Sequence, residues 1–510
     1  MSVIGGKDAS TVVRVIKRKD DSSPIGLLKE TERGQSNDGS EEWRRLERLK
    51  KRHGVSIPPG DPEDPYNWPS SRKISIGIIF SVGQLVTLMS SSITAAALDD
   101  ISADLGIGPA TTQITFSTYF LGLAFGPIFI AAVCEMNGRK NIWIAANLWY
   151  ILWNSLCPVG YSKGLMIAGR FLAATGASAG ITLTAPVMAD MYRAEKRGKS
   201  LAIATFLPYL GPALGPIVGG LATQLIHWSW VFWIVSIFNV VVTLLGVAVI
   251  KESYTPVLLR RKAIVPQEAS PLTARQWSFW HDIISRLGTN LLRPVQLLVQ
   301  RPIMQLIALD MALGFGIYTF MLSTFAALWI DRYGQSKLSG SLHYIAISVG
   351  STISAQVGSH VRKNIGNCDD IDGVKGKPEY RVPYMIIGAL IGPVGLFWYG
   401  WSAEYRVAWI LVDIGAAIFT CGSFMLSQAL LAYTLDEFGD HGASANAACR
   451  LLSNILGFAF PIFGPQLYEA LGYGLGNSLL ALLFIVIGLP IPFCLWIWGK
   501  KLRAIGRLPA

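Results

Sequence analysis

The stretch LGPALGPIVGG, Leu210–Gly220, combines glycine and proline in a pattern that decides the class of fold. Both residue types recur every four positions: Gly211, Gly215 and Gly219, and Pro208, Pro212 and Pro216. Positions four apart share one face of a helix, and a glycine stripe lets a second backbone approach closely. Prolines break helices in water, whereas neighbouring helices in a bilayer satisfy the freed backbone groups. The stretch predicts a kinked, tightly packed membrane helix; a packing face with no role in a mechanism is the simpler alternative.

The composition of the whole chain agrees with a protein that crosses a membrane several times. The 510 residues are 51% hydrophobic and only 15% charged, with a mean hydropathy of +0.41. A soluble protein of this length needs more surface charge. The formal net charge of +11 lies in the tails and between apolar runs, which favours loops beside anionic lipid over a nucleic-acid partner. The cysteines are scattered, so neither a metal site nor a disulfide framework is expected.

Twelve apolar runs follow a polar N-terminal tail, each of about 20 residues or more, the length that spans hydrocarbon. They lie near 74–96, 112–133, 141–160, 164–189, 200–223, 229–250, 303–329, 339–360, 383–402, 407–432, 445–467 and 476–498. Six runs precede a polar stretch and six follow it, which suggests a duplicated bundle. The sequence predicts an all-α membrane protein with 12 transmembrane helices in two six-helix, pseudo-symmetric halves.

This count divides the chain into five segments. They are a disordered tail (1–73), a first half (74–250), a central loop with an amphipathic helix (251–302), a second half (303–498) and a C-terminal tail (499–510). With the N-terminus inside, the short inner loops carry eleven Lys and Arg residues and the outer loops four. Since basic residues favour cytoplasmic loops, we expect both termini in the cytoplasm.

Charged residues inside the apolar runs mark a candidate site. Away from the ends of the runs we find Arg170, Asp310, Asp413 and Arg450. A charge in hydrocarbon costs about 2.5–3.5 kcal/mol, so these side chains should face a cavity or a partner. Every third run contains no charge, which predicts that these helices face lipid.

A proton site is one interpretation of these charges. We expect Asp413, and after it Asp310, to carry the proton, with Arg170 organising the site. Paired charges that only set the packing of helices are the alternative. The candidate lining of a central cavity is Gln84, Tyr119, Tyr318 and Arg450.

Three further motifs carry a family resemblance. They are GPIFIAAVCEMNGRK (Gly126–Lys140), the segment from Gly169-Arg170-Phe171 to Gly180, and the opening glycine–proline stretch. With them, residues 61–500 closely resemble the major facilitator superfamily, and more narrowly the fungal twelve-span drug:proton antiporters, which include polyamine and multidrug exporters.

The resemblance implies roles for these motifs. Glu135, Gly138, Arg139 and Asp190 would form a gating network that latches helix ends across the two halves, with Arg139 paired to Asp190. Ala131 and Met136 depart from the family pattern, which weakens this network. Arg170 would assist proton transfer. The span 5 antiporter motif, typical of exporters, would consist of Gly211, Pro212, Gly215, Pro216, Gly219 and Gly220.

The function expected from the resemblance is efflux of a small organic compound, a toxin, drug or fungal secondary metabolite, by alternating access. The proton gradient would drive it, with no metal or other cofactor. A monomer in the lipid bilayer of the plasma membrane is expected, with the vacuolar membrane as the alternative. Proton-coupled or facilitative uptake of a small nutrient is the rival function. The sequence has no nucleophile–base pair and no phosphate-binding loop, which argues against an enzyme.

Overall fold

A computed structural model describes residues 61–192, 200, 204, 207–262, 294–372, 378–438 and 442–505, all of which belong to one compact unit, Pro59–Ala510. Most of the N-terminal tail and most of the expected amphipathic helix of the central loop lie outside the described residues. Within this part of the chain, the secondary structure consists of helices and contains no strand.

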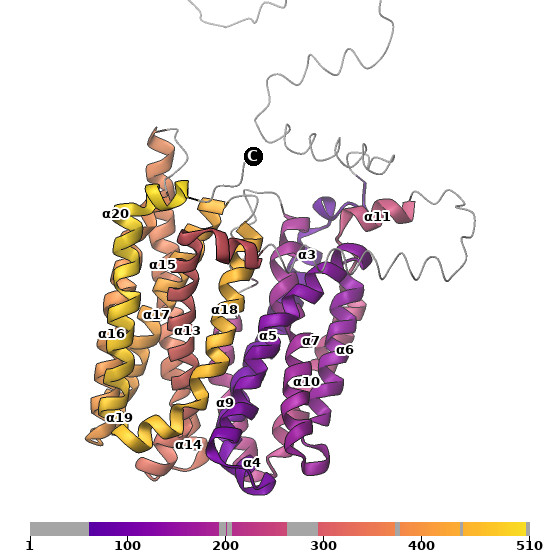
Figure 1. The fold of residues 1–510 in the computed structure, drawn as a ribbon. Coiled ribbons are helices and arrows are strands. Elements are labelled where there is room, and N and C mark those ends of the chain that lie inside the picture. The colour runs from indigo at the N-terminus through magenta and orange to yellow at the C-terminus, as the bar shows by residue number, and fades with distance from the viewer. Residues whose placement is uncertain are drawn as a thin grey trace, which may run out of the picture. The chain divides into compact units, whose positions relative to one another are not determined.

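The first half runs from α3 to α11 (Figure 1). Its helices are α3 (Ser70–Ser92), α4 (Leu98–Leu105), α5 (Pro109–Asn137), α6 (Arg139–Leu156), α7 (Lys163–Met191), α9 (Gly211–Leu225), α10 (Ser229–Val249) and α11 (Thr255–Lys262). A 3-10 segment, η2 (Ile93–Ala97), joins α3 to α4, and another, η4 (Leu207–Leu210), precedes α9.

The second half runs from α13 to α20. Its helices are α13 (Pro302–Ala327), α14 (Lys337–Leu342), α15 (Tyr344–Asp372), α16 (Val382–Glu404), α17 (Trp409–Phe438), α18 (Gly442–Ile462), α19 (Gly464–Leu483) and α20 (Pro490–Ala504). Two π-helical segments, η5 (Leu328–Arg332) and η8 (Phe484–Gly488), follow α13 and α19.

The chain is a multi-pass, all-α membrane protein. In its described part, eight helical stretches are long and apolar enough to cross a membrane: Ser70–Leu105, Pro109–Cys134, Lys163–Met191, Ser229–Val249, Pro302–Arg332, Pro378–Glu404, Trp409–Phe438 and Gly464–Ala504. The other predicted runs fall on α6, α9, α15 and α18. Each of the twelve predicted runs therefore coincides with helix.

The helices of the two halves pack in corresponding pairs. In the first half, α7 packs against α5 and α6, and α3 packs against α9. In the second half, α17 packs against α15 and α16, and α13 packs against α18. These are the same positions in each six-helix series, so the pairing supports the predicted duplication. Between the halves, α5 packs on α18, and α9 packs on α14 and α15.

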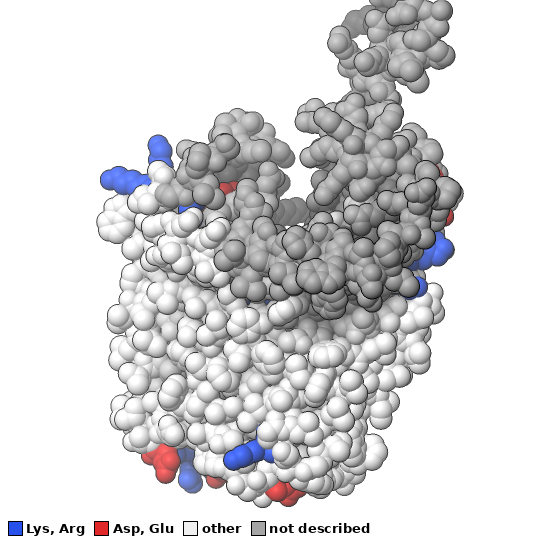
Figure 2. Space-filling view, turned by 45° about the vertical axis from the view of Figure 1, so that its right-hand side comes forward, with Lys and Arg blue, Asp and Glu red and all other residues white. Residues whose placement is uncertain are grey.

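Burial and charge are distributed over the bundle as expected for a protein in a membrane. The span that begins with α13 has 78% of its apolar window buried, whereas α10 and Gly464–Ala504 have 44% and 39%. The two least buried spans are runs 6 and 12, which were predicted to face lipid. Figure 2 shows charged side chains at the two ends of the visible face and a band without them between. We name the two ends the α11 end and the α4 end, after the helices that Figure 1 shows there.

Candidate functional site

The glycine stripe of α9 lies against the segment where α3 becomes η2. A Cβ atom on Gly211 would lie 2.7 Å from Cβ of Leu88, and one on Gly215 would lie 2.6 Å from the carbonyl oxygen of Met89. A Cβ on Gly219 would come closer still to the carbonyl oxygen of Ile93. The stripe is therefore a backbone-to-backbone contact, as its spacing predicted.

The prolines of this stretch act differently from the prediction. Pro208 lies in η4, and Pro212 stands in the first turn of α9, where a helix needs no backbone N–H. Pro216 alone lies inside the described helix. Pro208 in the 3-10 segment and Pro212 in the first turn of α9 therefore do not interrupt the helix, although both were expected to bend it.

A second face of α9, about 100° around the helix from the glycine stripe, meets the second half of the chain. A Cβ on Gly220 would lie 2.8 Å from the carbonyl oxygen of Lys337 in α14. The backbone N–H of Leu338 donates to Oε1 of Gln224 at 3.0 Å. Nζ of Lys337 lies 2.6 and 2.7 Å from the two carboxylate oxygens of Asp100 in α4. We call Asp100, Gly220, Gln224 and Lys337 the α4-end seam.

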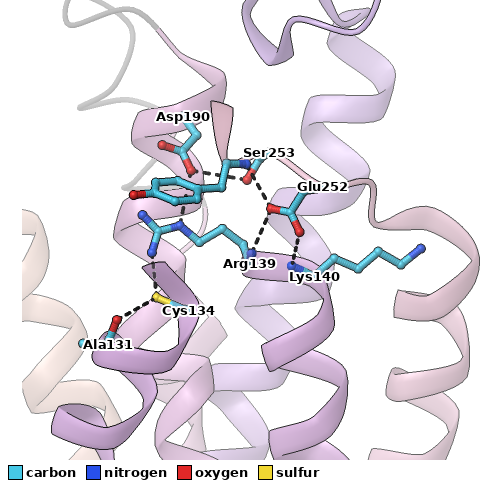
Figure 3. Close-up of polar contacts among 8 residues, drawn as sticks. Ala131, Cys134, Arg139, Lys140, Asp190, Glu252 and Ser253 are labelled. Atoms are coloured by element: carbon cyan, nitrogen blue, oxygen red, sulfur yellow. Dashed lines mark hydrogen bonds and ion pairs between the residues drawn. The ribbon is translucent and has the colours of Figure 1, made fainter. Parts of the chain in front are cut away.

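A second polar cluster lies at the α11 end, around the start of α6 (Figure 3). Nε of Arg139 lies 3.4 Å from Oδ2 of Asp190, the pairing that the family motif implied. Nη1 of Arg139 donates to Sγ of Cys134, and its guanidinium lies over the ring of Tyr254, 4.6 Å from the centroid. This cluster ties α5, α6 and α7 to the segment after α10.

Glu252 is the centre of this cluster and was missed by the sequence reasoning. Its carboxylate accepts hydrogen bonds from the backbone N–H groups of Arg139 (2.8 Å), Lys140 (3.2 Å) and Tyr254 (3.0 Å). A carboxylate at the N-terminus of α6 satisfies donors that the helix leaves free and stabilises its dipole. Gly138 adopts φ +91° beside it and leaves no room for a Cβ.

The expected latch between the two halves needs a correction. Among the described residues, the hydrogen-bond partners of Arg139 and Glu252 belong to the first half. The side chain of Glu135 lies outside the described part of the structure. The second half has its own pair in the same place, Arg381 before α16 with Asp436 near the end of α17. Each half therefore closes its own helix ends at the α11 end.

Arg170 does not organise either aspartate. Its guanidinium donates to the carbonyl oxygens of Ser90 (2.9 Å), Thr115 and Phe116 (both 3.4 Å) and to Oγ1 of Thr94. It also lies 4.4 Å from the ring centroid of Tyr119 and is 1% exposed. Its position fits a side chain that ties α3 and α5 to α7, because backbone carbonyls satisfy a buried guanidinium without a counter-ion.

The two aspartates lie in different environments. Asp310 in α13 is 1% exposed, and neither carboxylate oxygen has a hydrogen-bond partner among the described residues. It packs against Gly488. Asp413 in α17 has a partner that the sequence reasoning missed: its Oδ2 lies 2.7 Å from Nδ1 of His343. Nε2 of His343 lies 3.0 Å from Oε1 of Gln335, and the ring stacks on Trp329.

Only one of the four predicted cavity-lining residues is accessible. Gln84, Tyr119 and Tyr318 are 7%, 0% and 5% exposed. They pack between helices, and Tyr119 donates its hydroxyl to the carbonyl oxygen of Thr87 at 3.1 Å. Arg450, near the middle of α18, is exposed. The structure buries these three side chains between helices, and their place in a cavity lining stays a prediction.

Comparison with known proteins identifies a family with similar sequences. The family model described as the Major Facilitator Superfamily matches residues 80–461. A probable efflux pump of Aspergillus flavus is 39% identical over 420 residues, covering 80% of this chain and 98% of that protein. An efflux pump of Penicillium aethiopicum is 35% identical and covers 88% of this chain and 90% of its own length. An uncharacterized transporter of Schizosaccharomyces pombe is 34% identical, covering 88% and 93%.

Solved structures agree with this fold. A bacterial homologue of the human lysosomal transporter Spinster, in an inward-facing conformation, superposes with a TM-score of 0.62 at 10% identity, covering 87% of this chain and all of that chain. The xylose transporter XylE of E. coli gives a TM-score of 0.59 at 13% identity, covering 83% and 98%. At these identities the likeness concerns the fold alone.

Proposed function

Because the chain belongs to the Major Facilitator Superfamily, we propose that it exports a small organic compound by alternating access, driven by the proton gradient. The α4-end seam carries this proposal, because there the span 5 motif packs on the first half with one face and on the second half with the other. Relatives named efflux pumps support the direction of transport.

The contacts across the seam suit an interface that opens and closes. Among the described residues, the ion pair between Asp100 and Lys337 is the one that joins the two halves. Both side chains are about 30% exposed, and an ion pair in that environment contributes about 0–1 kcal/mol. The contacts of the α9 glycines are close but involve few side chains. Such a seam keeps the α4 end closed, and opening it costs little free energy.

The α11 end is proposed to face the cytoplasm, because the short loops there carry most of the Lys and Arg residues. Substrate then enters from the α11 end and leaves when the α4-end seam opens. The plasma membrane is the proposed location. A monomer suffices, since one chain supplies both faces of the seam.

The proposed proton site is the pair formed by His343 and Asp413. His343 lies between α14 and α15, and α14 carries Lys337 of the seam. Histidine is the side chain whose charge most readily changes near neutral pH. The side chains of the pair are 9% and 15% exposed, so adding or removing a proton changes a mostly buried contact. That change displaces α14 and loosens the seam. Asp310 is the second candidate.

The experiment uses a yeast strain that lacks its own drug exporters and expresses the chain. We expect protection against at least one toxic amphiphile in a broad panel. In inside-out vesicles, the same compound should accumulate only when the lumen is acidic. Asp413→Asn should abolish this accumulation while the protein still reaches the membrane. Sensitisation instead of protection would favour the rival uptake function, and accumulation without a pH gradient would contradict proton coupling.

A further inference from the structure

One side of α18, the helix that packs on α5 of the first half and on α13 of the second, carries a polar stripe. Asn446, Arg450 and Ser453 are spaced by four and three residues, so they share one side of the helix. Gly457 continues the same side toward the α4 end, where it packs against the ring of Phe315. The stripe thus starts near the α11 end and stops at an aromatic contact.

Arg450 is the exposed member of this stripe and lies deep in the bundle. It is the ninth residue of α18, so it stands roughly 12 Å along the axis from the start of the helix. That distance places it well inside a hydrocarbon layer of about 30 Å. Arg450 is exposed, and the helix that carries it packs on α5 of the first half.

The other arginines of the bundle show what satisfied guanidinium groups look like. Arg301 pairs with Glu437 and Arg332 pairs with Glu404, while Arg170 is held by backbone carbonyls. In the described part of the chain, the guanidinium of Arg450 has neither a carboxylate nor a carbonyl partner. A cation at this depth without a partner is costly, so a ligand is the expected counter-ion.

One neighbour of Arg450 points to the same conclusion. Oγ of Ser453 is buried and lacks a hydrogen-bond partner within the described residues, and a hydroxyl can donate to an oxyanion. Oδ1 of Asn446 is also buried without a partner among the described residues, but an amide oxygen only accepts hydrogen bonds and does not bind an anion. The stripe therefore offers one positive charge with one hydroxyl donor beside it.

We propose that the exported compound is an amphiphilic organic acid whose carboxylate binds Arg450. The planar guanidinium presents paired donors that match a carboxylate. The apolar body of the compound would lie toward the aromatic rings that join the halves: Phe120 contacts Phe315 with centroids 5.7 Å apart, and Phe315 contacts Tyr318 at 6.1 Å. This inference rests on the proposed export function for its direction. A membrane potential that is negative inside then assists export, because the cargo is an anion.

The test measures binding to the purified full-length chain by thermal unfolding in detergent. The probes are 1-naphthoate and 9-anthracenecarboxylate, the methyl ester of each, and 1-naphthylmethylamine. We expect the acids to raise the melting temperature and the esters and the amine to leave it unchanged. Arg450→Gln should weaken binding of the acids at least tenfold. Arg450→Lys should bind with intermediate affinity, because it keeps the charge and loses the planar fork. Lys501→Gln removes an exposed charge on α20 and should bind as the natural chain does.

Equal protection by acids and esters, protection by neither, or unchanged binding in Arg450→Gln would overturn the proposal. If Arg450→Gln does not yield a monodisperse protein, Ser453→Ala takes its place in the test. We then expect a several-fold loss of affinity for the acids and no change for the esters and the amine. Binding requires neither a gradient nor a direction. Acids that bind at Arg450 but are never exported would leave the binding site standing and would overturn the proposal that the acid is the exported compound. Export of a neutral compound by Arg450→Gln at an unchanged rate would leave the export function standing and would overturn the role of Arg450 in binding its cargo.

Discussion

Oδ2 of Asp413 lies 2.7 Å from Nδ1 of His343, and the ring of His343 stacks on Trp329 with centroids 3.6 Å apart. The two residues are 70 positions apart in the chain. Since His343 lies directly between α14 and α15, the pair connects the middle of the second half to the short helix that carries Lys337. The contact between His343 and Asp413 thus lies beside the part of the seam that the proposed export cycle opens.

A first prediction concerns this pair. His343→Gln keeps a polar side chain of similar reach but removes the imidazole ring that contacts Asp413 and stacks on Trp329, so proton-driven transport should fall at least tenfold and lose its dependence on external pH. The measurement is export rate across external pH 5 to 8. His227→Gln is the matched control, because His227 also contacts an aspartate, Asp104, but its side chain is 45% exposed. The same loss in both variants would argue against a specific role for His343.

A second prediction concerns the glycine stripe. Gly215→Leu places side-chain atoms where a Cβ alone would lie 2.6 Å from the carbonyl oxygen of Met89. We expect a destabilisation of about 1–3 kcal/mol and transport reduced at least tenfold, with the protein still inserted. Leu214→Ala on the outward face, 36% exposed, should transport normally. Full activity of Gly215→Leu would mean that α9 and α3 need not approach closely during the cycle.

A third prediction concerns the ion pair of the seam. Asp100→Asn and Lys337→Gln should each shift the resting protein toward a state open at the α4 end. Labelling of a cysteine placed at Ser341, which is 1% exposed and lies against Gly220 in the closed seam, reports this state. The swapped pair, Asp100→Lys with Lys337→Asp, should restore slow labelling. The coupling in this double-mutant cycle should be about 0.2–1 kcal/mol, since both side chains are partly exposed. Absence of any coupling would show that the contact does not hold the seam.

A fourth prediction concerns the carboxylate at the start of α6. Glu252→Ala leaves three backbone N–H groups without their acceptor. The loss of a helix cap costs about 0.5–2 kcal/mol, so the melting temperature should fall measurably. Lys251→Ala alters the exposed preceding residue and should leave it unchanged. Equal effects would indicate that the connection after α10, and not the cap, matters.

The sequence predicted the features that local spacing encodes. Twelve apolar runs predicted the helical segments of the bundle. A four-residue glycine repeat predicted which face of α9 packs closely on another backbone. Both patterns depend only on residues that are near one another in the chain. The pairing of Arg139 with Asp190 was available from the family motif. In each case a local pattern in the sequence is enough to make the prediction without knowledge of the tertiary structure.

Contacts between distant residues were not predictable in the same way. Glu252 binds Arg139 across 113 positions, and a single glutamate after an apolar run has no pattern that reveals its partner. His343 looked like one scattered histidine. Arg170 was expected to organise the proton site, but its guanidinium donates to carbonyl oxygens of α3 and α5. Backbone acceptors leave no trace in the sequence.

The most direct test of the account is the distance across the α4-end seam as a function of pH. Spin labels at Ala103 in α4 and Leu342 in α14, both exposed, report it by pulsed electron resonance in lipid nanodiscs without any substrate. We predict a single short distance at pH 8 and a growing population of longer distances at pH 5, with this growth absent in Asp413→Asn. A distance distribution that does not change with pH, or one that changes equally in Asp413→Asn, would contradict the proposed coupling.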